Sequence, residues 1–284
     1  MVDVREGKPE DTPRRRRRPR ARWLWLAVPV VLVVGGAAVA VLALRDPARP
    51  VSVDEAVARY RAAGDHGSGG EAAGLDAVPP GVYRYATQGS EGVDALHGST
   101  HTFPDVTTVT VSPAARHCLA ARWDALAQRW DSEVLCPGPG GAWDLTTFVQ
   151  FHSFFNQDEE RSSTCDAPGY VPAGSDRGTT RFTCHSPRSS NGGANEQAAT
   201  RRVIGIASVR VAGVDRPAVH VRYAARVTGA NAGNWTLDRW YSLDRFPLVV
   251  RADYREATAS HTAIGTVHYH ESYRTTLAAW EPRR

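Results

Sequence analysis

The C-terminal third of the sequence consists of long segments in which apolar and polar residues alternate, joined by short turns. In residues 218–228, Val, Tyr or Ala occupies each odd position, and most even positions are polar or charged. Alternation with a period of two is typical of a β-strand that buries one face. The connections at 214–217, 229–233 and 243–247 are too short to hold a crossover helix. Consecutive strands must therefore pair antiparallel.

The same signals predict strands from residue 81 onward. The expected strands span 81–87, 105–112, 142–155, 203–213, 217–229, 234–243, 247–257 and 263–277. Roughly eight to ten long antiparallel strands in a single domain curl into a barrel, a half-barrel or a sandwich. We therefore expect a mainly β fold, a curved antiparallel meander with half-barrel or barrel-like architecture.

One segment breaks this rhythm. Residues 156–201 are polar, rich in Gly, Ser, Thr and Pro, and show no sustained alternation. A structureless segment of this length in a compact domain is usually functional or disordered. We therefore expect a polar loop at 156–201 within the β-domain.

The triplet Arg-Trp-Asp occurs at 122–124 and again at 129–131, between Cys118 and Cys136. A helix over this stretch would place the two cysteines about 27 Å apart, beyond the reach of a disulfide. It would also put basic residues at its N-terminal end and acidic residues at its C-terminal end, which opposes the helix dipole. A hairpin centred on Ala127 places the cysteines directly opposite each other. We favour the hairpin over the helix, with Trp123 and Trp130 on opposite faces of the sheet.

The chain has four cysteines, Cys118, Cys136, Cys165 and Cys184. Four cysteines without a Cys-x-x-Cys motif suit two structural disulfides in an oxidising compartment. Given the hairpin, the expected pairs are Cys118–Cys136 and Cys165–Cys184.

An uncharged apolar run extends from residue 23 to residue 44. A helix of this length spans about 33 Å, which matches a hydrocarbon core of about 30 Å. Because arginines crowd 14–22 and few follow the run, the positive-inside rule places the N-terminus in the cytoplasm. We expect a basic cytoplasmic tail at 1–22, a single transmembrane signal anchor at 23–44, and an extracytoplasmic remainder at the cell membrane. Cleavage of a signal peptide after Ala38-Val39-Ala40 is the alternative.

A short helix and a linker are expected over residues 45–80. Ser52 and Glu55 have the spacing of a capping box, which predicts a helix that begins after Ser52 and ends near Gly64. Residues 64–74 have the composition of a flexible linker. The extracytoplasmic β-domain then covers 81–284.

No strong catalytic motif is present. The sequence has no Gly-x-Ser-x-Gly elbow, no His-Glu-x-x-His motif, no phosphate-binding loop and no dinucleotide fingerprint. His268 and His270 share one face of a strand and, with His261, could bind a metal. However, Tyr269 and Tyr273 mark the opposite face as the buried one, so we expect solvated histidines. We expect no catalytic residue, no cofactor and no metal ligand.

The positive charge of the chain lies in its tail. The net charge is +4, and residues 1–22 hold nine basic against four acidic residues. The remainder is therefore close to neutral, which argues against nucleic acid as a partner.

The segment FVQFHSFF at 148–155 is apolar on both faces. Phe148 and Phe154 share one face, whereas Val149, Phe151 and Phe155 share the other. Such a strand is either packed on both sides in the core or lines a groove for a hydrophobic ligand. The candidate apolar ligand face comprises Phe148, Phe151, Phe154 and Trp240.

The meander at about 200–280, with its turn Leu243-Asp244-Arg245-Phe246-Pro247-Leu248, resembles the curved sheets of LolA/LppX-like lipoprotein and lipid carriers. The resemblance implies an apolar concave face that holds acyl chains, and it assigns no functional residue. The whole chain resembles single-pass envelope proteins of high-GC Gram-positive bacteria, which implies no activity.

Three functions are compatible with these observations. The first is a membrane-tethered extracytoplasmic binding module for a hydrophobic or lipid ligand. The second is a structural or sensory ectodomain that docks another envelope protein through the 156–201 segment. The third is a hydrolase with a dispersed site. The sequence favours a non-enzymatic module without deciding its oligomeric state.

Overall fold

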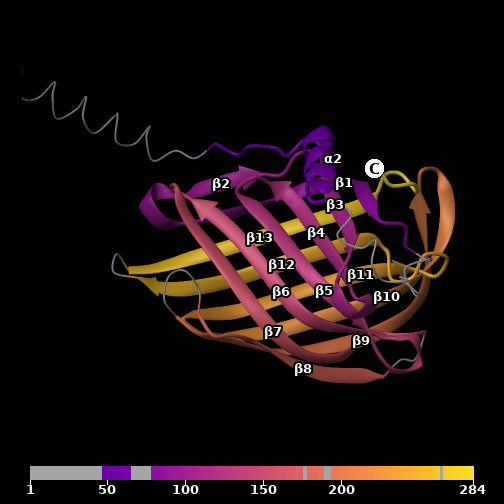
Figure 1. Cartoon of the computed structure of the whole chain (residues 1–284). Helices are drawn as coiled ribbons and strands as arrows, with labels where there is room; N and C mark the ends of the chain where they lie inside the picture. Colours follow the sequence, from indigo (N-terminus) through magenta and orange to yellow (C-terminus); the bar gives the residue numbers. More distant parts are fainter. Residues whose placement is uncertain (1–46, 65–77, 175–177, 189–192, 263–264) are drawn as a thin grey trace, which may run out of the picture. The chain divides into compact units, whose positions relative to one another are not determined.

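The computed structural model describes residues 47–64, 78–174, 178–188, 193–262 and 265–284 (Figure 1). Within these ranges, no helix is both long enough and apolar enough to cross a membrane. The tail predicted at 1–22, the transmembrane helix predicted at 23–44 and almost all of the predicted linker lie outside the described residues.

The described part of the chain is almost entirely β. One α-helix, α2 (Val53–Ala62), comes first, and short 3₁₀ helices lie at Ala95–His97, Ala115–His117 and Pro139–Gly141. The strands are β1 (Gly81–Val93), β2 (Ser99–Thr102), β3 (Val106–Pro113), β4 (Leu119–Leu126), β5 (Arg129–Pro137), β6 (Trp143–Phe154), β7 (Gln157–Val171), β8 (Thr179–Ser186), β9 (Asn195–Val211), β10 (Val214–Gly229), β11 (Asn231–Ser242), β12 (Val249–Thr262) and β13 (Gly265–Leu277).

These strands form a closed antiparallel barrel (Figure 1). From β3 to β13 each strand pairs with the next in the chain, and β13 then pairs with β1, which also pairs with β3. The short strand β2 is added to the edge of β1 beyond β3. Twelve of the described strands therefore form the barrel wall. The mainly β meander predicted from the sequence is confirmed, and its architecture is a closed barrel and not a half-barrel.

The hairpin predicted between Cys118 and Cys136 is present as β4 and β5. Leu119 lies opposite Leu135 and Trp123 opposite Asp131, so the register is centred on residue 127 as expected. Both predicted disulfides are present, Cys118–Cys136 and Cys165–Cys184.

The polar loop predicted at 156–201 is wrong, because β7, β8 and the first half of β9 lie within it. The inner positions of these strands carry polar residues that are nevertheless buried, among them Arg161, Ser163 and Gln197. Polar residues on both faces remove the alternation by which a strand is identified in sequence. The disulfide between Cys165 and Cys184, which face each other in the β7–β8 register, links these strands.

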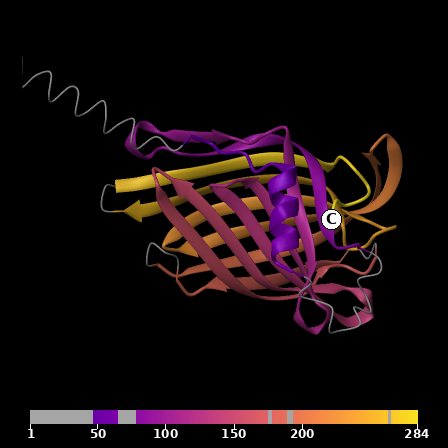
Figure 2. The same ribbon diagram turned by 45° about the horizontal axis from the view of Figure 1, so that its top comes forward.

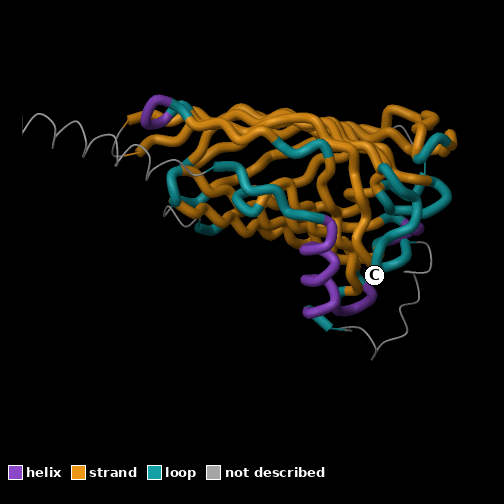
Figure 3. The backbone as a smooth tube through the Cα atoms, turned by 90° about the horizontal axis from the view of Figure 1, so that it is seen from above, coloured by secondary structure: helices purple, strands orange, loops and turns teal. Residues whose placement is uncertain are grey.

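Helix α2 packs on the outer wall of the barrel beside β1 and β3 (Figures 2 and 3). The predicted cap is confirmed, since the Ser52 hydroxyl accepts a hydrogen bond from the Glu55 backbone amide at 3.1 Å. Ala56 and Val57 are buried against Val82, whose side chain points away from the barrel interior. Full burial of a valine side chain stabilises by roughly 1.5–3 kcal/mol, so this contact contributes to holding the helix on the wall.

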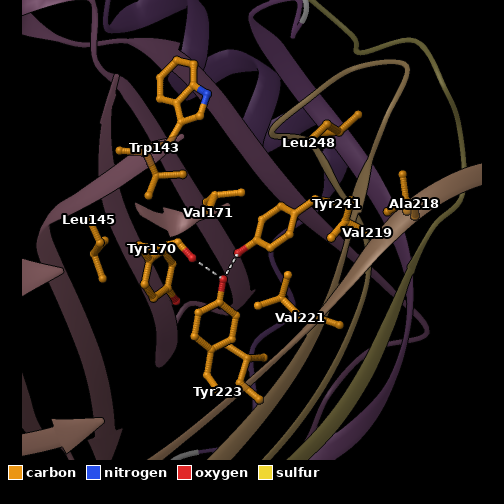
Figure 4. Packing of buried hydrophobic residues seen from close by; sticks show 14 of the residues in the cluster. Trp143, Leu145, Tyr170, Val171, Ala218, Val219, Val221, Tyr223, Tyr241 and Leu248 are labelled. Carbon is orange, nitrogen blue, oxygen red and sulfur yellow. Dashed lines mark hydrogen bonds between the residues drawn. The ribbon is translucent and has the colours of Figure 1, made fainter. Parts of the chain in front are cut away.

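The largest apolar cluster fills one end of the barrel interior. Its centre is a set of tyrosines, in which the Tyr223 hydroxyl donates to the Tyr170 backbone oxygen at 2.7 Å (Figure 4). The hydroxyls of Tyr223 and Tyr241 lie 3.0 Å apart. Buried phenol groups need such partners, because an unpaired buried hydroxyl costs about 1–3 kcal/mol.

Candidate functional site

Two adjoining cavities lie inside the barrel. Cavity 1, of about 80 Å³, has mainly apolar walls. Those walls include Val109, Val111, Leu119, Leu135, Leu248 and Val249. Most of this cavity therefore suits an apolar group, although Asp131, Glu133, Arg239 and Thr275 also line it.

Cavity 2, of about 50 Å³, is lined by aromatic and polar side chains. The aromatic residues are Phe148, Tyr170, Phe182, Trp235, Tyr254 and Tyr273. The polar residues are Asp131, Gln150, Arg161, Gln197, Arg239 and Glu256. Mostly apolar walls with a few convergent polar groups are typical of small-molecule sites.

The two cavities share part of their walls. Asp131, Phe148, Arg239 and Tyr273 line both. Arg239 is held in place by Glu133, because its Nη1 donates to both carboxylate oxygens at 3.0 and 2.9 Å. A ligand that enters one cavity therefore meets a fixed ion pair at the boundary with the other.

The size of the cavities limits what they can hold. An apolar cavity of about 150 Å³ is enough for one benzene molecule. Each cavity is smaller than that, and the two together come close to it. Pockets for drug-sized ligands measure about 300–1,000 Å³. The barrel interior as described suits a molecule with one ring or a short chain.

A row of acidic residues crosses the seam at which β1 and β13 close the barrel. In the strand register, Glu91 of β1 lies opposite Glu271 of β13, and Glu271 lies opposite Glu256 of β12. All three side chains are buried. Like charges directly opposite each other destabilise a sheet, so their presence in three successive strands demands compensation.

Arg129 supplies part of this compensation. It is fully buried, and its Nε and Nη2 donate to the two Glu271 oxygens at 3.0 and 2.9 Å. The Nη1 and Nη2 atoms also contact Asp131, whereas Glu91 lies 3.8 Å from Nε. One guanidinium group therefore contacts three carboxylates, those of Glu271, Asp131 and Glu91.

Two histidines contact Glu91, which lies at the other end of the row from Glu256. His101 Nδ1 lies 3.0 Å from Glu91 Oε1, and His152 Nδ1 lies 2.9 Å from Glu91 Oε2. The Tyr269 hydroxyl is 3.1 Å from Glu91 Oε2 and 3.0 Å from Glu271 Oε2. The cluster thus joins β1, β2, β5, β6 and β13 by buried polar contacts.

The two opposed glutamates have pKa values displaced in opposite directions. Burial alone would raise the pKa of Glu91, but hydrogen bonds from His101 and His152 lower it to about 2. Burial raises the pKa of Glu271 to about 8, against the opposing effect of Arg129. The pKa values of two adjacent buried carboxyl groups commonly move apart in this way, because it is costly for both groups to be charged at once.

The structure does not bring the predicted ligand face together. Phe148 lines both cavities, and Phe154 points inward, where it stacks on His101. Phe151 stacks on Trp130 on the outer face. Trp240 is also on the outer face, where it stacks on His220. Of the four residues, Phe148 alone lines cavity 1 or cavity 2.

The histidines weighed as metal ligands lie elsewhere. His268 is exposed, and its Nδ1 lies 2.6 Å from Asp94 Oδ2. Across the described ranges, no group of three or more His, Cys, Asp or Glu side chains is placed to hold a metal ion.

Sequence reasoning missed the acidic row, although the signal was present. Glu271 has the same parity as Tyr269 and Tyr273, which the sequence assigns to the buried face. In the same way, Glu91 occupies an odd position, like Tyr83 and Tyr85, and therefore lies on the same face of its strand as these tyrosines. A charged residue in phase with an apolar face predicts a buried charge, and a buried charge requires a partner.

Comparisons with known proteins give little further information. No family model matches the chain, and no curated protein matches it. The hypothetical lipoprotein YmcC from Escherichia coli K12 is 9% identical, with 66% of this chain and 85% of that chain covered at a TM-score of 0.29. A candidate lipoprotein from Parabacteroides distasonis is 10% identical, with 69% and 94% covered at a TM-score of 0.30. At these scores neither likeness bears on the function of this chain.

Proposed function

We propose that this chain is a binding module whose barrel interior takes a small hydrophobic ligand. The observation that carries the proposal is the pair of adjoining cavities, one with apolar walls and one with aromatic and polar walls. Protein interiors are otherwise close-packed. Two such spaces inside one core therefore mark the place where a ligand would be held.

The cavities narrow the class of ligand. A ligand with long acyl chains, as the resemblance to lipid carriers implies, is far larger than this space. A single aromatic ring, or a short chain with one polar end, is the appropriate size. The ring would occupy cavity 1 and extend across the shared wall into cavity 2, next to the Arg239–Glu133 pair.

We further propose that residues 23–44 tether this module to the cell membrane, with the barrel outside. The charge asymmetry around the apolar run supports this orientation. Two disulfides support an oxidising location for the barrel. Modification of accessible residues by a membrane-impermeant reagent on intact cells would test it, since a cytoplasmic barrel would stay unlabelled.

The binding proposal is tested with benzyl alcohol as the probe. The full-length chain, reconstituted in lipid nanodiscs, is titrated and followed by ligand-observed NMR, with empty nanodiscs subtracted. Ala252 lines cavity 1 and is buried, so the Ala252→Leu substitution fills part of the space and should weaken binding at least about tenfold, which corresponds to about 1.4 kcal/mol.

Ala257→Leu is the matched control. Ala257 lies on the same strand, β12, but is exposed on the outer face. This variant should bind benzyl alcohol as the wild type does. Equal binding by the Ala252→Leu variant and the wild type, or no binding by the wild type, would refute the proposal.

A further inference from the structure

Cavity 2 combines aromatic walls with an unbalanced negative charge. Six aromatic side chains surround about 50 Å³ of space. The faces of aromatic rings attract cations, and sites for organic ammonium groups are commonly built from several such rings. The charges around the cavity decide whether a cation would be accepted there.

The two arginines that line cavity 2 are already neutralised. Arg239 is paired with Glu133, both of whose oxygens accept from Nη1. Arg161 is buried and pairs with Glu159 at 2.9 Å. Each arginine thus has one carboxylate, and neither leaves a net positive charge for the cavity.

Glu256 is the carboxylate of cavity 2 without a basic partner among the described residues. It is 7% exposed, and it accepts hydrogen bonds from the Tyr254 hydroxyl at 2.6 Å and the Thr258 hydroxyl at 3.4 Å. Arg129, the guanidinium of the acidic row, already serves Asp131 and Glu271. A buried carboxylate without a cation is costly, because water is not there to solvate it.

Gln150 provides a second, independent observation. Its side chain is 5% exposed and lines cavity 2, and no side-chain hydrogen bond joins it to another described residue. Buried amides are almost always hydrogen-bonded. The amide oxygen of Gln150 is therefore available to accept a hydrogen bond from a ligand N–H.

We propose that cavity 2 binds the ammonium group of a small organic cation, with Glu256 as its counter-ion and Gln150 as a hydrogen-bond acceptor. The apolar part of the same ligand extends into cavity 1. This inference rests on the proposed function and specifies its ligand class. The ammonium group supplies the positive charge that Glu256 lacks, and the aromatic rings shield the ammonium group from water.

One feature of the cavity favours the opposite charge. The buried Nε of Arg161 has no hydrogen-bond partner within the described residues. An N–H of this kind would suit an acceptor oxygen, such as that of a carboxylate. The experiment therefore includes an anionic probe.

Three probes with one ring and different charges separate these cases: benzylammonium, benzyl alcohol and benzoate. The full-length chain in nanodiscs is titrated with each at pH 7, followed by ligand-observed NMR. Benzylammonium should bind at least about tenfold more tightly than benzyl alcohol, and benzoate should bind most weakly. Equal binding of the three, or tightest binding of benzoate, would overturn the inference while leaving the binding proposal intact. Failure of all three to bind would overturn both.

Glu256→Gln tests the assigned counter-ion. This variant should lose the preference for benzylammonium over benzyl alcohol. Glu196→Gln is the matched control, because Glu196 is exposed and its partner is His185. An undiminished cation preference in the Glu256→Gln variant would refute the role of Glu256. The comparison of the three probes on the wild type remains decisive if this variant does not fold.

Discussion

Replacement of Arg129 by Met tests whether the barrel seam depends on one buried guanidinium. Met has a similar length and no charge, so the substitution leaves Glu271, Asp131 and Glu91 without the cation that lies 2.9, 2.5 and 3.8 Å from them. Removal of one partner from a buried ion pair costs about 3–5 kcal/mol, since the remaining charge is uncompensated. We expect a loss of this size in the free energy of unfolding at pH 8.

The loss should be smaller at pH 5. Without Arg129, the folded state holds protons on its carboxyl groups more tightly than the unfolded state does. The stability of the variant relative to the wild type therefore falls as the pH rises. The signature is a larger difference between the two proteins at pH 8 than at pH 5.

Urea denaturation followed by tryptophan fluorescence measures both quantities. Arg222→Met is the control, because Arg222 is more than half exposed and its partner Asp238 lies 2.9 Å away on the outer face. Exposed pairs contribute about 0–1 kcal/mol. The reasoning would be refuted by an Arg129→Met variant within about 1 kcal/mol of the wild type at pH 8, or by a loss that does not change with pH.

Two further predictions concern the same barrel. Burial raises the pKa of Glu271 to about 8 from 4.5, so the contribution of Glu271 to stability is complete below pH 4.5 and is lost as the pH rises through 8. The Glu271→Gln variant should lack this pH-dependent contribution in urea titrations between pH 5 and 9. A variant with the same pH profile as the wild type would contradict the assignment. The double variant Cys118→Ser/Cys136→Ser opens a loop with a sequence separation of 18. It should lower the free energy of unfolding, measured by urea denaturation, by about 3 kcal/mol. A loss below about 1 kcal/mol would show that the β4–β5 hairpin does not need its disulfide.

The local features of this fold could be predicted because their causes are local. The β4–β5 hairpin follows from two cysteines and a short turn, and its register was predicted correctly. The helix cap at Ser52 follows from a four-residue motif. The inward face of β10 follows from alternation within the strand itself. In each case the residues that interact are neighbours in the chain.

Features that depend on distant strands could not be predicted in the same way. Strands β7 and β8 carry buried polar residues whose partners lie on another strand, such as Ser163 of β7 and Ser186 of β8, which hydrogen-bond to each other. Without knowledge of those partners, a polar inner face is indistinguishable from a loop. For the same reason, the candidate ligand residues Phe151 and Trp240 were grouped with Phe148 although the barrel places them on its outer face.

The sequence by itself determined the β-rich composition of the fold, the antiparallel order of neighbouring strands and the two disulfides. Only the tertiary structure decided that β13 pairs with β1, and with that pairing the opposition of Glu91 to Glu271. The reason is that periodicity reports which face of a strand is buried but not which strand lies beside it. The closure, the acidic row and the two cavities all arise from contacts between opposite ends of the β-domain, where no local pattern specifies a partner.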